Sequence, residues 1–198
     1  MIRGKLKNYA EIFSGFSFRA LPANEEQAVI SVVQPKDIDQ ATGQLVYQTA
    51  LKTNEFAGDP KHFLRLGDIL VSAKGKSTPI AIYDDPDKKV VGSSSLTVIR
   101  PQEEKLSADY IAWYLQLPST QLYLQASKTG TTVLNLSVKA IQEMECWLPD
   151  LIEQKKIGKL HRALLEKKAK QLELLEIENR LINDQLYRRL MGDKHKDK

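Results

Sequence analysis

The first 150 residues alternate short apolar runs with turn residues. Four runs are rich in β-branched side chains, at positions 28–33, 68–72, 79–83 and 96–100. Glycine, proline and aspartate separate these runs, and such residues favour turns because of their backbone preferences. Runs of this length and composition predict short strands.

A helical pattern follows toward the end of this region. In 108–117 the apolar residues recur at helical spacing, and Ser107 stands where an N-cap would. Two shorter helices are expected at 119–126 and at 137–144, the second with Ser137 as its N-cap. Many short strands followed by a few helices predict the α+β fold class.

The pattern changes after Leu148-Pro149-Asp150. From 152 to 190 there is no proline, and only Gly158 interrupts a run of strong helix formers. Such a helix would be about 55–60 Å long, far longer than the helices of an ordinary globular domain. We therefore expect three parts, which are a mixed, short-stranded domain at 1–150, a long helix of coiled-coil type at 151–191 and a disordered tail at 192–198.

Apolar residues of the long helix repeat with the heptad period of a coiled coil. One frame places at positions a and d the residues Leu165, Leu172, Leu175, Asn179, Ile182 and Leu186. Asn179 is a polar residue of the kind that fixes register, while Lys168 and Arg189 take the remaining d positions and weaken both ends of the seam. Further leucines widen the stripe, so the helix needs a partner. We expect dimerisation; the alternative is packing of the helix on its own domain.

The composition is that of a globular protein, with 42% hydrophobic and 27% charged residues. No apolar run approaches the ~18–20 residues that cross a bilayer, and the start lacks the apolar region of a secretory signal. Cys146 is the only cysteine, which excludes an internal disulfide. His62, His161 and His195 show no metal-ligand spacing. We expect a cytoplasmic protein without a membrane segment, metal or cofactor.

The positive charge of the chain belongs to its C-terminal part. Residues 1–150 hold 16 Lys and Arg against 17 Asp and Glu, whereas residues 151–198 hold 13 against 8. A basic total usually indicates nucleic acid, but here any DNA-binding face in the first part must be a local patch. Aromatic residues do not mark such a patch, because Trp113, Tyr114 and Trp147 fit the core better than a stacking platform.

Several stretches, taken in order, resemble a known family. They are A-E-I-F-S-G-F-S-F-R at 10–19, Q-P-K-D-I at 34–38, L-G-D-I-L-V-S-A-K-G at 66–75, V-I-R-P at 98–101, Y-I-A-W-Y-L at 110–115, G-T-T-V-L-N-L-S at 130–137, and L-P followed by E-Q-K-K-I at 148–157. Their order and spacing, with the long terminal helix, resemble the specificity subunits of type I restriction-modification systems over nearly the entire chain. Lys74 stands where this family usually has arginine.

The resemblance implies an architecture and a set of partners. Members of the family usually contain two target-recognition domains and two long helices that pair antiparallel as a spacer. Each domain reads one half of a split DNA sequence, and methyltransferase subunits dock around the helices. Because this chain has one domain and one helix, a homodimer would read a gapped palindrome. The alternatives are a fragment, or a subunit that pairs with a different half.

DNA reading requires side chains that hydrogen-bond base edges and donors that hold phosphates. The residues expected to do so lie in turns near three glycines and are Ser17, Arg19, Lys74, Lys76, Ser77, Thr78, Lys128, Thr131, Thr132 and Asn135. The lysines are expected at phosphates, so affinity should fall with salt. The alternative is structural, with the glycines shaping turns and the Thr and Asn side chains capping neighbouring elements.

Two other functions fit parts of the sequence. Asp84, Asp85 and Asp87, together with Glu103-Glu104-Lys105, could hold Mg²⁺ in a nuclease, although both stretches have the composition of solvated turns. The chain lacks both a nucleotide-binding Gly-rich loop and the Asn/Asp-Pro-Pro-aromatic run of adenine methyltransferases. We therefore expect a non-catalytic recognition subunit, with catalysis in a methyltransferase and in a restriction or translocase subunit. The remaining alternative is an interaction scaffold without DNA specificity.

Overall fold

The main sheet has four antiparallel strands in the order β2-β8-β5-β6. These strands are β2 (Ala10–Ser14), β8 (Leu96–Pro101), β5 (Ile69–Ser72) and β6 (Ile80–Ile82). Each residue of β5 is buried, which explains its continuous apolar run. The computed structural model describes residues 2–18 and 28–191 of the chain, and the expected tail at 192–198 lies outside them.

A second sheet lies beside the first, in the order β4-β3-β7. β3 (Ile30–Val33) pairs antiparallel with β4 (Leu51–Thr53) and parallel with β7 (Lys89–Gly92). Two short ribbons complete the strands, namely β1 (Ile2–Lys5) with β11 (Glu145–Leu148), and β9 (Lys128–Thr129) with β10 (Asn135–Leu136). Three 3-10 turns connect these elements, at Leu6–Asn8, Pro35–Asp37 and Pro60–His62.

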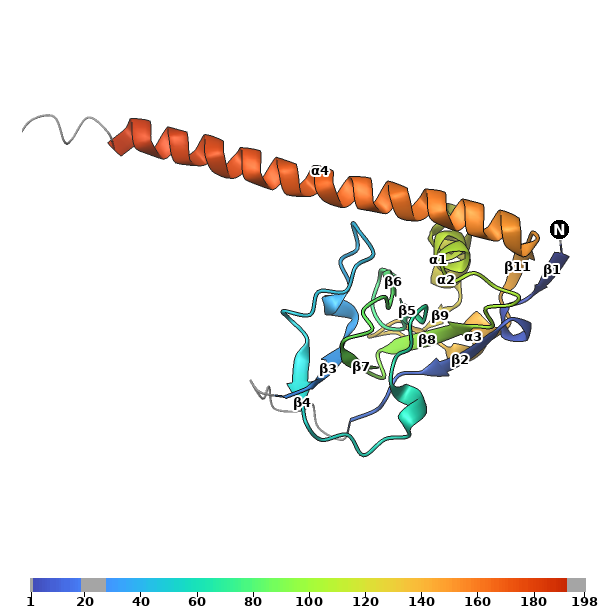
Figure 1. Cartoon of the computed structure of the whole chain (residues 1–198). Coiled ribbons are helices and arrows are strands. Elements are labelled where there is room, and N and C mark those ends of the chain that lie inside the picture. The colour runs from blue at the N-terminus through green and yellow to red at the C-terminus, as the bar shows by residue number, and fades with distance from the viewer. Residues whose placement is uncertain (1, 19–27, 192–198) are drawn as a thin grey trace, which may run out of the picture.

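The three short helices are α1 (Ala108–Gln116), α2 (Pro118–Ala126) and α3 (Val138–Gln142). α1 lies between the main sheet and the long helix, as Figure 1 shows, whereas α3 packs beside β2. The Ser137 hydroxyl accepts the Ala140 N–H at 3.1 Å and caps α3 as expected. Ser107 does precede α1, but its hydroxyl makes no capping hydrogen bond.

The acidic residues of two sequence motifs, Asp68 and Asp37, have structural roles. Asp68 is buried and accepts two hydrogen bonds from the Arg100 guanidinium, at 2.9 and 2.7 Å. Arg100 also donates to the Phe63 carbonyl at 3.1 Å. Asp37, fully buried, accepts the Gln34 N–H at 2.9 Å and caps its own turn. Buried carboxylates require such partners, so these acids hold loops in place.

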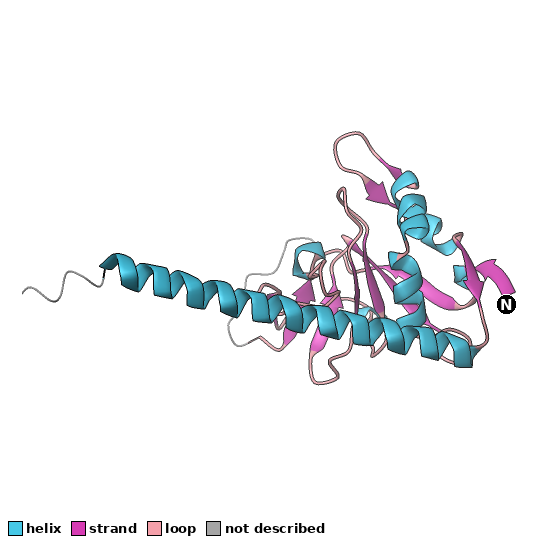
Figure 2. Cartoon of the chain, turned by 90° about the horizontal axis from the view of Figure 1, so that it is seen from above, coloured by secondary structure: helices cyan, strands magenta, loops and turns pink. Residues whose placement is uncertain are grey.

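The long helix α4 spans Leu151–Met191, 41 residues, and extends well beyond the domain (Figures 1 and 2). Only its first turns pack on the domain. Gln154 is buried there, accepts the Ser107 N–H at 3.0 Å and donates to the Pro149 carbonyl at 2.9 Å. Arg162 donates to Asp109 of α1 at 2.5 and 3.0 Å.

Gly158 allows α4 to lie closely on α1. A Cβ at this position would come within 2.6 Å of the Asp109 Cβ and 3.0 Å of the Tyr110 backbone nitrogen. Gln154, Gly158 and Arg162 follow one another at four-residue spacing, so they share one face of the helix. This face fixes the direction in which α4 leaves the domain.

The α+β class and the long terminal helix are confirmed. The expected core position is wrong for Trp147, whose side chain is 49% exposed. It lies on β11, where exposed and buried residues alternate, and it falls on the outward side. Trp113 and Tyr114 of α1 are half-buried against the core. Among the described residues, no helix is both long and apolar enough to cross a membrane.

Candidate nucleic-acid interface

Three chain segments meet at one end of the main sheet. β2 and β5 both finish there and β8 begins there, since Ser14 lies opposite Thr97 and Ser72 opposite Leu96. The segments 15–18, 73–78 and 93–95 therefore emerge side by side. Loops at the end of a rigid sheet are a common place for binding residues.

Gly15 brings the first of these segments against the third. The Gly15 N–H donates to the Leu96 carbonyl at 2.9 Å, and the Phe16 N–H donates to the Gly92 carbonyl at 2.7 Å. A Cβ on Gly15 would lie 2.2 Å from the Ser93 carbonyl oxygen, so no larger residue fits this approach. The arrangement carries the exposed Ser17 onto this end of the sheet.

The second segment pairs with the hairpin formed by β9 and β10. The Leu136 N–H donates to the Ala73 carbonyl at 2.7 Å, and the Gly75 N–H donates to the Leu134 carbonyl at 3.1 Å. Lys74 and Asn135 form a β-bridge between these two hydrogen bonds. The structure thus brings together two clusters that are more than fifty residues apart in sequence. We call the segments 15–18, 73–78, 93–95 and 129–135 the loop edge.

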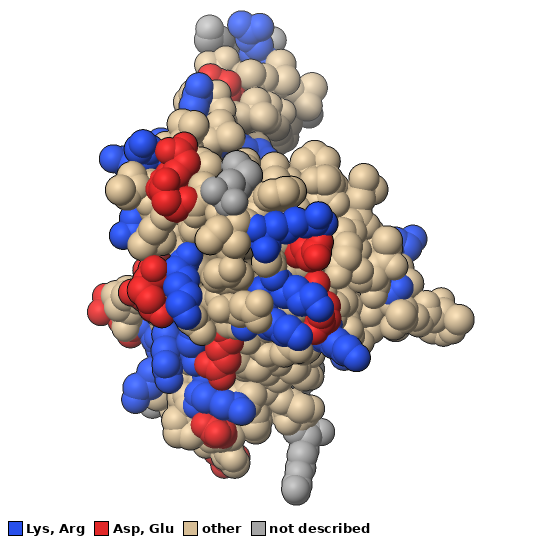
Figure 3. Space-filling model, turned by 90° about the vertical axis from the view of Figure 1, so that its right-hand side faces the viewer, with Lys and Arg blue, Asp and Glu red and all other residues tan. Residues whose placement is uncertain are grey.

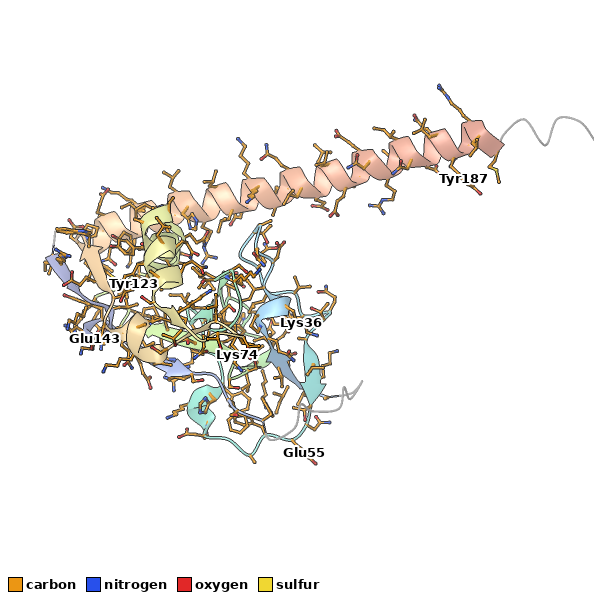
Figure 4. The ribbon with its side chains drawn as sticks, turned by 180° about the vertical axis from the view of Figure 1, so that it is seen from behind. Lys36, Glu55, Lys74, Tyr123, Glu143 and Tyr187 are labelled. Atoms are coloured by element: carbon orange, nitrogen blue, oxygen red, sulfur yellow. The ribbon has the colours of Figure 1, made fainter. Side chains whose placement is uncertain are left out.

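The tip of the loop edge stands clear of the domain. The loop between β9 and β10 projects outward in Figure 2, and Lys74 faces the viewer near the middle of the domain in Figure 4. Gly130 opens this loop with a backbone φ of +115°, which favours glycine. The exposed polar side chains here include those of Lys74, Lys76, Ser77, Thr131, Thr132 and Asn135, and the apolar Val133 and Leu134 are exposed beside them.

Lys128 holds a turn in place, whereas the sequence predicted that it contacts a phosphate. Its ammonium group donates to the carbonyls of Gly75, Lys76 and Ser77 at 2.8, 3.3 and 3.0 Å. The side chain is buried, and this burial lowers the pKa of the ammonium group. An ammonium has three donors, and all are used, so Lys128 fixes the turn at 75–77 and does not face solvent as a phosphate contact would.

Thr78 and Arg19 were also expected to contact DNA. Thr78 is buried, and its hydroxyl accepts a hydrogen bond from the Gln125 amide at 3.2 Å, which removes it from the exposed surface. Arg19 lies outside the described residues.

Residues 4–178 match the family model described as the type I restriction modification DNA specificity domain. The chain belongs to this family.

Solved structures support the fold of this specificity domain. One chain comes from work on complex assembly and conformational transition of a type I R-M system, with 18% identity and a TM-score of 0.68 over 96% of this chain and 44% of that one. The S subunit from M. genitalium has 16% identity and a TM-score of 0.64, over 98% of this chain and 46% of that one. HsdS from Thermoanaerobacter tengcongensis has 19% identity and a TM-score of 0.58, over 89% and 39%.

This specificity-domain chain therefore spans less than half the length of each of those solved chains. The search of curated proteins found no match.

The loop edge contains residues that sequence reasoning missed. Ser94 and Ser95 form the turn between Ser93 and β8, and both are half-buried. This turn lies beside the exposed segment that carries Lys74, because the Ala73 N–H donates to the Ser95 carbonyl at 2.9 Å. The Ser93 hydroxyl is buried, and within the described chain it has no hydrogen-bond partner. The signal was present as three consecutive serines after a glycine, which is a polar turn between two apolar strands.

The specificity domain's helix exposes most of the expected dimerisation seam. The exposed fractions of Leu172, Leu175, Ile182 and Leu186 are 37%, 52%, 54% and 56%, and Asn179 is exposed as well. Leu165 differs, because it is half-buried and lines a small cavity between α4 and the domain with Gly43 and Ile80. Packing on its own domain thus applies to the first turns of α4, and the distal half lacks a partner within the described chain.

The acidic residues weighed for a nuclease do not converge. Asp85 forms an ion pair with Lys88 in a surface turn, and Asp84 lies 3.7 Å from Arg162 of α4. Within the described ranges, no three His, Cys, Asp or Glu side chains gather as they would around a metal ion. Figure 3 shows that charges of both signs alternate on the end of the molecule near the N-terminus, so that end is not one basic field.

Proposed function

We propose that the loop edge reads one half of a split DNA sequence. The proposal is supported by the family of the chain and by the pairing of segment 73–78 with the β9–β10 hairpin, which gathers exposed hydroxyl, amide and ammonium groups on one end of a rigid sheet. Thr131, Thr132 and Asn135 supply donors and acceptors suited to base edges. Lys74 and Lys76 supply charge for phosphates.

In this proposal the protein reads DNA as a homodimer. Burial of the apolar side chains on the distal half of α4 against a second copy would stabilise the pair, at roughly 25 cal/mol per Å² of apolar surface. Two identical readers related by a two-fold axis bind inverted copies of one half-site. The length of α4 sets the gap between them. The dimer then recruits methyltransferase and restriction or translocase subunits in the cytoplasm, and needs no cofactor of its own.

Selection from random DNA duplexes tests the reading function. The purified protein should enrich an inverted repeat of one motif with a fixed gap. Lys74→Met should weaken binding to every duplex alike, because a phosphate contact carries no sequence information. Lys105→Met is the matched control, since Lys105 follows the opposite end of β8 and donates to Gln102. Enrichment of no sequence would refute the proposal and favour an interaction scaffold.

Light scattering tests the dimer separately. Replacing Leu175 and Ile182 by serine should give a folded monomer, because both lie on the exposed seam. Leu174 and Leu181 are similarly exposed but lie about 100° around the helix from this seam, so serine at those positions should weaken the dimer much less. A wild-type monomer at tens of micromolar would refute the homodimer.

A further inference from the structure

Two apolar side chains are exposed at the tip of the loop edge. Val133 is 56% exposed and Leu134 is 37% exposed, in the loop between β9 and β10 that projects outward in Figure 2. Their neighbours in this loop, Thr132 and Asn135, are polar. Apolar surface rimmed by polar groups is typical of an interaction site, because it gains free energy when another surface covers it. The hydrogen bonds and phosphate contacts proposed above do not use this pair.

The backbone of the loop holds the apolar pair in place. A Cβ on Gly130 would lie 2.4 Å from the Val133 carbonyl oxygen, so the chain turns tightly between these two residues. The Leu134 carbonyl accepts the Gly75 N–H at 3.1 Å, which ties the next residue to the neighbouring segment of the loop edge. Val133 is therefore presented by a fixed backbone, and less conformational entropy is lost when it binds.

The charge around the pair favours a polyanionic partner. The four segments of the loop edge contain Lys74 and Lys76 and no Asp or Glu, although residues 1–150 as a whole hold 17 acidic against 16 basic residues. Both lysine side chains are exposed, and Lys74 forms the β-bridge with Asn135, two residues from Val133. Double-stranded DNA offers phosphates to such lysines and apolar groups on its base edges. It is therefore the surface that fits the whole tip.

One apolar group on the base edges suits a short aliphatic side chain. In the major groove, thymine differs from the other bases by its 5-methyl group. Val133 and Asn135 are at most about 7 Å apart along the chain, and stacked base pairs are ~3.4 Å apart. Both side chains can therefore contact base pairs within two or three steps of one half-site. Of the apolar pair, Val133 is the more exposed, and its branched side chain is stiff.

We propose that Val133 contacts the 5-methyl group of a thymine in the major groove and thereby selects thymine at one position of the half-site. The proposal rests on DNA reading by the loop edge and adds an apolar contact to it. Hydrogen-bonding residues such as Asn135 then read neighbouring positions, while Lys74 and Lys76 hold the backbone.

Deoxyuridine tests this contact, because it lacks the 5-methyl group of thymine and keeps the same hydrogen-bonding groups. The full chain first selects its motif from random duplexes. Each thymine of one selected half-site, on either strand, is then replaced singly by deoxyuridine, and the dissociation constant is measured by fluorescence anisotropy. Loss of one buried methyl group should weaken wild-type binding about fourfold at one position, which corresponds to ~0.8 kcal/mol.

Three variants assign this effect to Val133. Val133→Ser should bind the thymine and deoxyuridine duplexes alike at that position, with a urea midpoint equal to wild type, because the side chain is exposed. Val133→Ile keeps an apolar side chain and should retain the difference. Leu66→Ser is the matched control, since Leu66 is 55% exposed and precedes β5, at the opposite end of this strand from the loop edge. It should behave as wild type.

Each other outcome overturns the contact. Equal wild-type affinity for thymine and deoxyuridine at every position, or a selected half-site without thymine on either strand, would overturn it and leave DNA reading by the loop edge standing. Full discrimination by Val133→Ser would also overturn it, and would indicate that a protein surface covers Val133. Selection of no sequence at all would overturn both the contact and the proposed reading function.

Discussion

Replacement of Lys128 by methionine tests whether this lysine positions the turn at 75–77 or contacts a phosphate. The ammonium group holds three carbonyls of the turn at 75–77. Each hydrogen bond to a charged group contributes about 1.5–3 kcal/mol. The cost of burying the ammonium group offsets part of this stabilisation. In the variant, water can reach the carbonyls that lose their donor, because the turn itself is exposed. We therefore expect a loss of about 2 kcal/mol in the free energy of unfolding, measured by urea denaturation.

DNA affinity should fall as well, but with a distinctive salt dependence. A lysine that neutralises one phosphate contributes about 0.9 to the slope of log K against log salt concentration. Lys74→Met should reduce the slope by about this amount and leave stability unchanged. Lys128→Met should weaken binding at every salt concentration with an unchanged slope, because it disturbs the turn that carries Lys74 and Lys76.

The measurement is a titration of one fluorescent duplex at salt concentrations between about 50 and 300 mM, where such binding depends steeply on salt. A reduced slope for Lys128→Met with normal stability would refute the positioning role, since it would identify Lys128 as a phosphate contact. An unchanged slope for Lys74→Met would remove Lys74 from the proposed interface.

Three further predictions concern stability. Gly158→Val should cost about 1–3 kcal/mol, because its side chain overlaps α1, and urea denaturation should detect the loss; an undamaged variant would show that α4 does not pack as described. Asp68→Ala should cost about 3–5 kcal/mol, since it leaves Arg100 without its buried partner, and a denaturation midpoint equal to wild type would contradict this. Burial lowers the pKa of both His62 and His161 below the ordinary 6.5. The unfolded chain then binds protons more readily, so stability should be highest above pH 6.5 and decrease below it; a urea midpoint that does not fall between pH 7.5 and 5.5 would contradict the prediction.

The sequence predicted those elements whose pattern is local. The strands β3, β5 and β6 lie within the expected runs, and β8 extends one residue beyond its run, because β-branched residues and flanking turns mark them. The long helix begins at Leu151, at the change of composition. β1 and β11 were not expected, since each is short and partly polar and its partner lies at the other end of the chain.

The candidate site required long-range information. Sequence pattern identified the clusters around Lys74 and Asn135, but not that a β-bridge joins them. It also gave no means of telling Lys74 from Lys128, because only the packed turn shows which ammonium group is buried. Gly158 looked like an interruption of the helix, whereas its close approach to Asp109 becomes evident only when both helices are in place.

Selection of DNA by the full chain tests the central claim most directly, because one rigid helix pair and two identical loop edges determine the form of the site. The account predicts an inverted repeat of one half-site with a single gap length. Three residues inserted into α4 after Leu181 should disturb the pairing and abolish that gap preference. Recovery of one half-site alone, or of repeats with any gap, would contradict it.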